Sequence, residues 1–140
     1  MKKYIVLVVV ALLVVNVQLN AQTYRIIVNN SNSITSLSKT EVSNFFLKKR
    51  IQWSNGTEVV PVDLNARSPV RETFSKDIHN KTTAQVRAFW QQSVFSGKAT
   101  PPVEMDNDDK VIEFVKANPG AIGYVSATAN VQGVKVITVN

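Results

Sequence analysis

The sequence contains no cysteine and a single histidine, His79, and each scarcity excludes a kind of chemistry. Without a thiol, the chain forms no disulfide and has no cysteine nucleophile. A serine nucleophile would need His79 as its base, and nothing in the sequence places a serine beside it. We therefore interpret His79 as a surface or helix-capping residue, and we expect no enzymatic activity, no catalytic residue and no cofactor.

Metal-binding patterns are also missing. The acidic run EMDNDD at 104–109 superficially resembles a calcium loop, but it lacks the central glycine and has Lys110 where a ligand should be. We interpret the run as the acidic cap and first turn of a helix, and we expect no metal site.

The charge balance is modest. Lys2 and Lys3 precede the apolar segment described next, and without them 14 basic residues face ten acidic ones, a net charge of +4. Such a chain favours anionic ligands, but no basic and aromatic residues interleave along a strand as a single-strand binder needs. We therefore expect no nucleic-acid partner.

The first 21 residues have the order of a secretory signal peptide: a basic head, an apolar core and a small residue at the cut. We expect cleavage after Ala21 and a single exported, periplasmic domain over 22–140, with no stable membrane span after cleavage. The alternative is an uncleaved membrane anchor, but the apolar run is short for a bilayer crossing, which needs about 20 residues.

The remaining segments alternate between strand and helix patterns. Strands are predicted at 23–30, 58–62, 121–126 and 133–139, and helices at 38–50, 69–78, 82–95 and 106–118. Ser38 with Glu41 and Thr82 with Gln85 are capping boxes, and Ser68 followed by Pro69 also fits a helix start. This alternation indicates an α/β domain, a mixed sheet flanked by helices, whose core we expect to contain the following residues: Ile27, Phe45, Phe46, Val60, Phe74, Phe89, Trp90, Phe114, Ile122 and Tyr124.

The segment ARSPVR at 66–71 puts two cations at the start of a helix, where the helix dipole disfavours them. A bound anion would reverse that preference, because a helix start offers free N–H groups and arginine matches the geometry of oxyanions. The hypothesis is an oxyanion cradle made of Arg67, Ser68, Val70 and Arg71. The alternative is that the arginines face solvent, that Glu72 neutralises Arg71 and that Ser68 is merely a cap.

A second basic group, Lys48, Lys49 and Arg50, follows the first helix pattern. Its simplest interpretation is favourable interaction with the negative carboxyl end of that helix. The alternative is a patch that faces an anion.

Several segments occur in the order found in the periplasmic phosphate-binding proteins of ABC transporters, and the stretch from about Thr35 to Ile137 resembles their second lobe. The matching pieces are FFLKKRIQWSNGTEVVPVD, SPVRETF, VRAFWQQSVFSGKATPP and VIEFVKANPGAIGYV. The resemblance implies a single three-layer lobe of a type II periplasmic-binding-protein-like fold. In that family, phosphate meets hydroxyls, an arginine and helix amides, and the helix-start motif falls here on Ser68 and Arg71.

The resemblance implies a non-enzymatic, exported binding protein for inorganic phosphate or a similar oxyanion, associated with phosphate uptake. The family has two lobes, whereas 22–140 suffices for one, and NNSNSIT at 29–35 has no glycine where the first-lobe phosphate loop would lie. The alternative is an envelope protein-interaction domain that kept the lobe and lost the ligand. Its partner would be a transporter component or a second copy of the chain.

Overall fold

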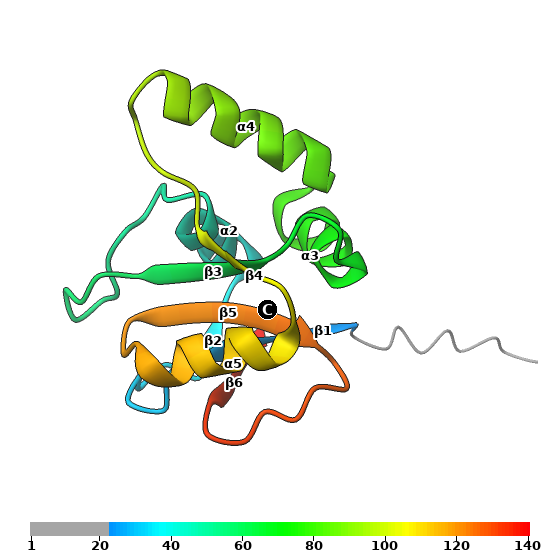
Figure 1. The fold of residues 1–140 in the computed structure, drawn as a ribbon. Coiled ribbons are helices and arrows are strands. Elements are labelled where there is room, and N and C mark those ends of the chain that lie inside the picture. Colours follow the sequence, from blue (N-terminus) through cyan, green and yellow to red (C-terminus); the bar gives the residue numbers. More distant parts are fainter. Residues whose placement is uncertain (1–22) are drawn as a thin grey trace, which may run out of the picture.

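The computed structural model describes residues 23–140, which form one mixed sheet with helices on both faces (Figure 1). The strand order is β2-β6-β1-β5-β3-β4. The strands are β1 (Tyr24–Val28), β2 (Ser36–Leu37), β3 (Val60–Leu64), β4 (Val103–Met105), β5 (Ala121–Ser126) and β6 (Lys135–Val139). The helices are α2 (Lys39–Phe46), α3 (Pro69–His79), α4 (Thr83–Phe95) and α5 (Asp108–Ala117).

Both parallel and antiparallel pairs occur in the sheet. β1 runs antiparallel to β5 and β6, whereas β3 is parallel to both β5 and β4, and β2 is parallel to β6. Parallel neighbours need a crossover that packs on the sheet, and the chain makes these crossovers with its helices. The carboxyl ends of β3 and β4 therefore lie together, next to the starts of α3 and α5.

Two neighbouring residues of β5 show how the layers form. The Cα of Gly123 faces Val111 and Val115 of α5, so closely that a Cβ there would lie 2.8 Å from the Val111 side chain. Tyr124 points to the opposite face, where its ring stacks on Phe74 of α3 at 3.8 Å and lies 5.7 Å from the Phe46 ring of α2. The expected three-layer α/β arrangement is confirmed.

Local capping signals placed three helices correctly. Ser38 and Thr82 form the predicted capping boxes, and Ser68 caps α3 with Pro69 in its first turn. The cap of α5 differs from the prediction, because Asn107 accepts from the Lys110 amide while the acidic residues occupy the first turn. A second difference is β4, whose three residues lie in a stretch that we had not assigned to a strand.

The core largely follows the sequence pattern. Seven of the ten expected residues are buried: Ile27, Phe45, Phe46, Phe74, Trp90, Ile122 and Tyr124. Val60, Phe89 and Phe114 are half-buried instead. Phe89 sits on α4, which stands apart from the sheet and covers only a small second cluster around Leu47, Val86 and Trp90 (Figure 1).

The predicted signal peptide, 1–21, lies outside the described residues. Within residues 23–140, no helix is both long and apolar enough to cross a membrane.

The close approach of α5 to β5 gives a direct test of the layering. Gly123→Ala places a methyl group against Val111 and Val62, and we expect a loss of about 1–3 kcal/mol in the free energy of unfolding, because a packed core must shift to admit it. Urea denaturation followed by circular dichroism measures the loss. Unchanged stability would contradict the tight contact between α5 and the sheet.

Candidate oxyanion site

A buried ion pair joins the carboxyl ends of β3 and β4 to the start of α3. The Arg71 side chain is 3% exposed, and its Nη1 lies 2.6 Å from Glu104 Oε1, while its Nη2 lies 3.9 Å from Asp63 Oδ2. Nη1 also donates to the Leu64 carbonyl at 3.0 Å. Arg71 therefore ties a helix to two adjacent strands.

Asp63 is the buried carboxylate of this group. Its Oδ1 accepts a hydrogen bond from the Tyr124 hydroxyl at 2.8 Å, and that hydroxyl accepts from the Leu64 amide at 3.2 Å. Burial raises the pKa of the Asp63 carboxyl to about 6, because the Arg71 cation and the Tyr124 hydrogen bond offset just part of the desolvation cost. Burial lowers the pKa of Arg71, but the nearby carboxylates outweigh this and leave it raised.

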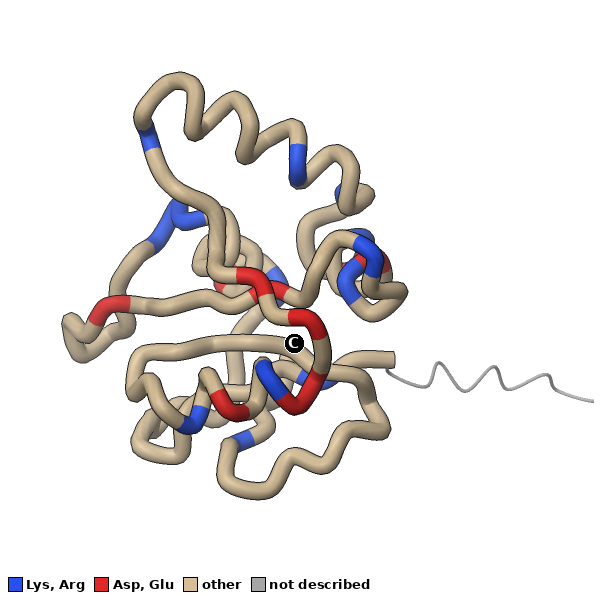
Figure 2. Tube along the Cα trace, in the orientation of Figure 1, with Lys and Arg blue, Asp and Glu red and all other residues tan. Residues whose placement is uncertain are grey.

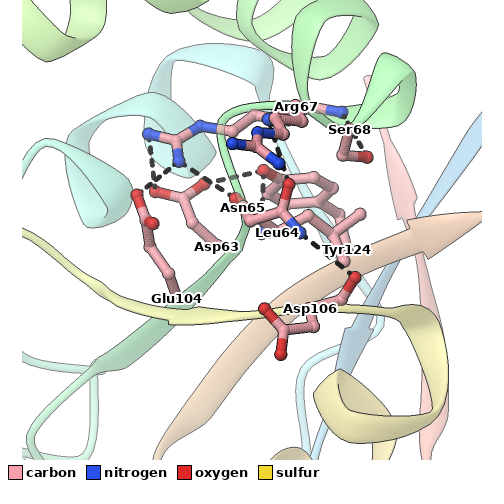
Figure 3. A network of polar contacts seen from close by, with 9 residues as sticks. Asp63, Leu64, Asn65, Arg67, Ser68, Glu104, Asp106 and Tyr124 are labelled. Carbon is pink, nitrogen blue, oxygen red and sulfur yellow. Dashed lines mark hydrogen bonds and ion pairs between the residues drawn. The ribbon is translucent and has the colours of Figure 1, made fainter.

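The turn between β3 and α3 is organised by Asn65. Its backbone amide donates to the Met105 carbonyl at 3.0 Å, its side-chain amide donates to the Asp106 carbonyl at 3.2 Å, and its Oδ1 accepts from the Arg67 amide at 3.0 Å. The Ser68 amide donates to the Asn65 carbonyl at 3.1 Å. Figure 3 shows Asn65, Arg67 and Ser68 on this turn, with Asp106 across from them.

The start of α3 keeps two hydrogen-bond donors without acceptors among residues 23–140. Ser68 Oγ accepts from the Arg71 amide at 3.4 Å, which leaves the hydroxyl proton free to donate. The Val70 amide has no acceptor, as is usual for the first turn of a helix. Both donors face the same end of the helix dipole, which favours an anion.

A cavity of about 260 Å3 opens beside this turn and is lined by Asn65, Ala66, Arg67 and Asp106. Arg67 is exposed and has no carboxylate within 4 Å among the described residues, whereas Asp106 pairs with Lys110 at 3.5 Å. The turn therefore offers one unpaired cation, an amide side chain and one carboxylate to a small ligand.

The structure brings the four residues of the predicted cradle to one turn, but it gives them different surroundings. Arg67, Ser68 and Val70 lie at the open end of α3, whereas the Arg71 guanidinium is already held by Asp63 and Glu104. The alternative in which Glu72 neutralises Arg71 was wrong. Glu72 pairs with Lys76 at 3.4 Å and accepts a hydrogen bond from the Thr83 amide. Anion contact by these residues stays a prediction.

Sequence reasoning missed four polar residues of this region: Asp63, Asn65, Glu104 and Asp106. A signal existed for the first two, because they directly follow the apolar run of β3, and ligands of open α/β sheets bind beyond the carboxyl ends of strands. The other two could be found only by placing β4 beside β3, which the sequence pattern did not indicate.

His79 is half-buried in the last turn of α3, so it lies at a helix end, as one of the two interpretations had it, but is not fully at the surface. The structure also places a serine beside it, since Ser43 Oγ lies 2.7 Å from His79 Nδ1. Burial and the nearby cations Lys81, Arg71 and Lys49 lower the pKa of His79 to about 4. No carboxylate among residues 23–140 hydrogen-bonds to the ring, so the pair lacks the third member of a catalytic triad.

Comparison with solved structures identifies the architecture. The chain superimposes on an ABC-type phosphate transport receptor from Vibrio cholerae with a TM-score of 0.67 and 17% identity, covering 84% of this chain and 46% of that one. PstS from Borrelia burgdorferi gives a TM-score of 0.66 and 15% identity, covering 84% and 47%. A Clostridium perfringens protein whose structure holds bound phosphate gives a TM-score of 0.66 and 18% identity, covering 84% and 44%.

The shared fold is that of one lobe of the type II periplasmic-binding-protein class, and the chain spans less than half the length of the solved chains that it matches. No protein-family model and no curated protein matches the sequence. These likenesses establish the fold.

The Arg71 network predicts that this arginine stabilises the unliganded protein. Arg71→Ala strands Asp63 as a buried, unpaired carboxyl, and we expect a loss of about 3–5 kcal/mol in the free energy of unfolding. The control is the double variant Asp63→Asn with Arg71→Ala, in which no buried carboxylate is left without its cation. In urea denaturation it should recover a large part of the stability that Arg71→Ala loses. Equal losses in the single and the double variant would contradict the coupling between Arg71 and Asp63.

The raised pKa of Asp63 also predicts that the free energy of unfolding depends on pH. Its folded-state pKa of about 6 lies above the ordinary value of 3.8, so its contribution to stability is full below pH 3.8 and is lost as the pH rises through about 6. The stability of the natural protein relative to Asp63→Asn should fall by about 3 kcal/mol between pH 3.5 and pH 7. Urea denaturation of both proteins across this range measures the difference; a constant difference would contradict the raised pKa.

Proposed function

We propose that the protein binds inorganic phosphate, or a similar oxyanion, at the turn that joins β3 to α3, and that it acts without catalysis. The observation that carries the proposal is the cavity lined by Asn65, Arg67 and Asp106, on the turn that leads directly into Ser68, the N-cap of α3. The fold, shared with one lobe of solved phosphate transport receptors, supports the same assignment.

Each residue of the turn has a role in this proposal. Arg67 supplies charge and a planar pair of donors, the Ser68 hydroxyl and the Val70 amide donate to further oxygens, and Asn65 shapes the turn. Arg71 is a positioning residue, because its guanidinium already serves two carboxylates and the end of β3. Arg71 holds the start of α3 against β3 and β4, and this contact fixes the positions of the Ser68 hydroxyl and the Val70 amide.

Asp106 adds selectivity. An ionised carboxylate can only accept hydrogen bonds, so it suits an oxyanion that still carries a proton. Phosphate at neutral pH carries at least one proton, whereas sulfate carries none. We therefore favour phosphate over sulfate as the ligand.

The cellular role that we propose is exported and periplasmic, with 1–21 as a cleaved signal peptide and 22–140 as the binding domain. An association with phosphate uptake would require a transporter or envelope partner. The site lies on one lobe and is open to solvent, where screening weakens ionic contacts. We therefore expect weak binding unless a partner supplies the opposite wall.

The direct test is calorimetric titration of residues 22–140 with phosphate at low ionic strength. Arg67→Ala should weaken binding by roughly tenfold, the low end of the loss of a charge-assisted contact. Arg87→Ala removes the same charge on α4 and should leave the affinity unchanged. Asp106→Asn should raise the affinity for sulfate relative to phosphate, because an amide can donate to an unprotonated oxygen.

Equal effects of the Arg67 and Arg87 variants would show attraction by net charge alone and would overturn the site. An absence of measurable phosphate binding would favour the second candidate function, an envelope interaction domain. That candidate is supported by the exposed end of α4, where Phe95 is 95% and Val94 52% exposed beside an apolar cavity of about 480 Å3.

A further inference from the structure

A separate basic cavity lies between the turn after α2 and the carboxyl end of α4. Its volume is about 450 Å3, and its cationic wall consists of Lys48, Lys49 and Lys98. Figure 2 shows the corresponding blue segments on the same side of the molecule, on the turn after α2 and on the connection that leaves α4. The rest of the wall is polar or apolar, from Leu47, Phe89, Trp90, Gln92, Ser93, Ser96 and Ala99, with no acidic residue among them.

The three lysines of this basic cavity are not neutralised within the part of the chain that the structure describes. No carboxylate lies within 4 Å of any of them, and the contact recorded for the Lys48 ammonium is the Thr100 hydroxyl at 3.5 Å. Three ammonium groups around one concavity repel each other and raise the local potential, which attracts a multivalent anion.

Lys48 adopts a backbone conformation that lysine seldom takes. Its φ is +54°, in the left-handed region where glycine or asparagine is preferred at the end of a helix. The conformation closes the end of α2, where the Lys49 amide donates to the Asn44 carbonyl and the Lys48 amide to the Phe45 carbonyl. This helix end places a half-buried lysine, where glycine would be less strained, at the wall of the basic cavity.

The simplest competing account is that these lysine ammonium groups interact with the last carbonyls at the negative ends of α2 and α4. The hydrogen bonds do not support it. Backbone amides already cap the last carbonyls: Phe45 O accepts from Lys48 N at 3.2 Å, and Asn44 O accepts from Lys49 N at 2.9 Å. At the end of α4, Ser93 O accepts from the Lys98 amide at 3.0 Å. No lysine ammonium in this group is hydrogen-bonded to a helix carbonyl.

Trp90 and Ser93 also line this wall. Trp90 is 5% exposed and borders both the basic cavity and the apolar cavity at the end of α4, and its indole N–H has no acceptor among residues 23–140. The indole nitrogen itself has almost no exposed surface, so Trp90 serves here as a reporter of binding and not as a contact to the anion. The Ser93 hydroxyl is half-buried on the same wall and has no hydrogen-bond partner among the described residues.

We propose that the basic cavity binds a compact polyanion that carries several phosphate groups, such as pyrophosphate or tripolyphosphate. A single orthophosphate fills a small part of a cavity of this size, and the lysines come from two separate segments, so linked phosphates reach more of them. The basic cavity is distinct from the turn after β3, and this proposal does not depend on whether that turn binds phosphate.

The test is calorimetric titration of residues 22–140 with tripolyphosphate, orthophosphate and citrate at equal ionic strength. We expect tripolyphosphate to bind at least tenfold more tightly than citrate, and its binding to shift the Trp90 indole signal in the nitrogen–proton spectrum. Lys48→Gln and Lys98→Gln should each weaken it by roughly five- to tenfold. In an Arg67→Ala background, which removes the cation of the proposed oxyanion site, the Trp90 shift and the dependence on Lys48 and Lys98 should persist, which separates the two sites.

Lys48→Gly separates binding from folding. Glycine relieves the left-handed strain, so this variant should keep or raise the thermal midpoint while losing as much tripolyphosphate affinity as Lys48→Gln. Lys116→Gln, an exposed lysine on α5, is the control for net charge and should have no effect. Equal weakening by Lys116→Gln, equal affinity for citrate, or a Lys48→Gly variant that binds normally would each overturn the proposal.

Discussion

The buried contact between Arg71 and Asp63 is the interaction on which the rest of this region depends. It places a cation from the first turn of α3 against the last residues of β3, and Glu104 brings β4 into the same group. Such a pair is costly to bury and more costly to break, because either partner alone would be an uncompensated charge. The turn that carries Asn65, Arg67 and Ser68 begins and ends on residues that this group holds in place.

That arrangement gives the two arginines of the turn separate tasks. Arg71 is used inside the protein, whereas Arg67 remains exposed beside a cavity. The unfavourable position of two cations at a helix start is therefore resolved in two ways. One charge is neutralised by buried carboxylates, and we propose that the other meets a bound oxyanion.

The fold could be predicted in large part, and the site in smaller part. Capping residues such as Ser68 and Thr82 act over three residues, so their signals are local and the helices began where expected. β4 has three residues, of which two are exposed, so it has no apolar period that would reveal it. Because β4 was missed, Glu104 and Asp106 were assigned to a helix cap instead of to the neighbourhood of Arg71.

The sequence by itself determined the α/β alternation, the helix starts and most of the core, because each rests on residues that are close along the chain. The tertiary structure alone decided which charges meet. Asp63, Arg71 and Glu104 are brought together by strand pairing across 41 residues, and Ser43 reaches His79 across 36. Local patterns record which faces are buried, but the partner of a buried charge depends on the order of strands in the sheet, and no short segment contains that order.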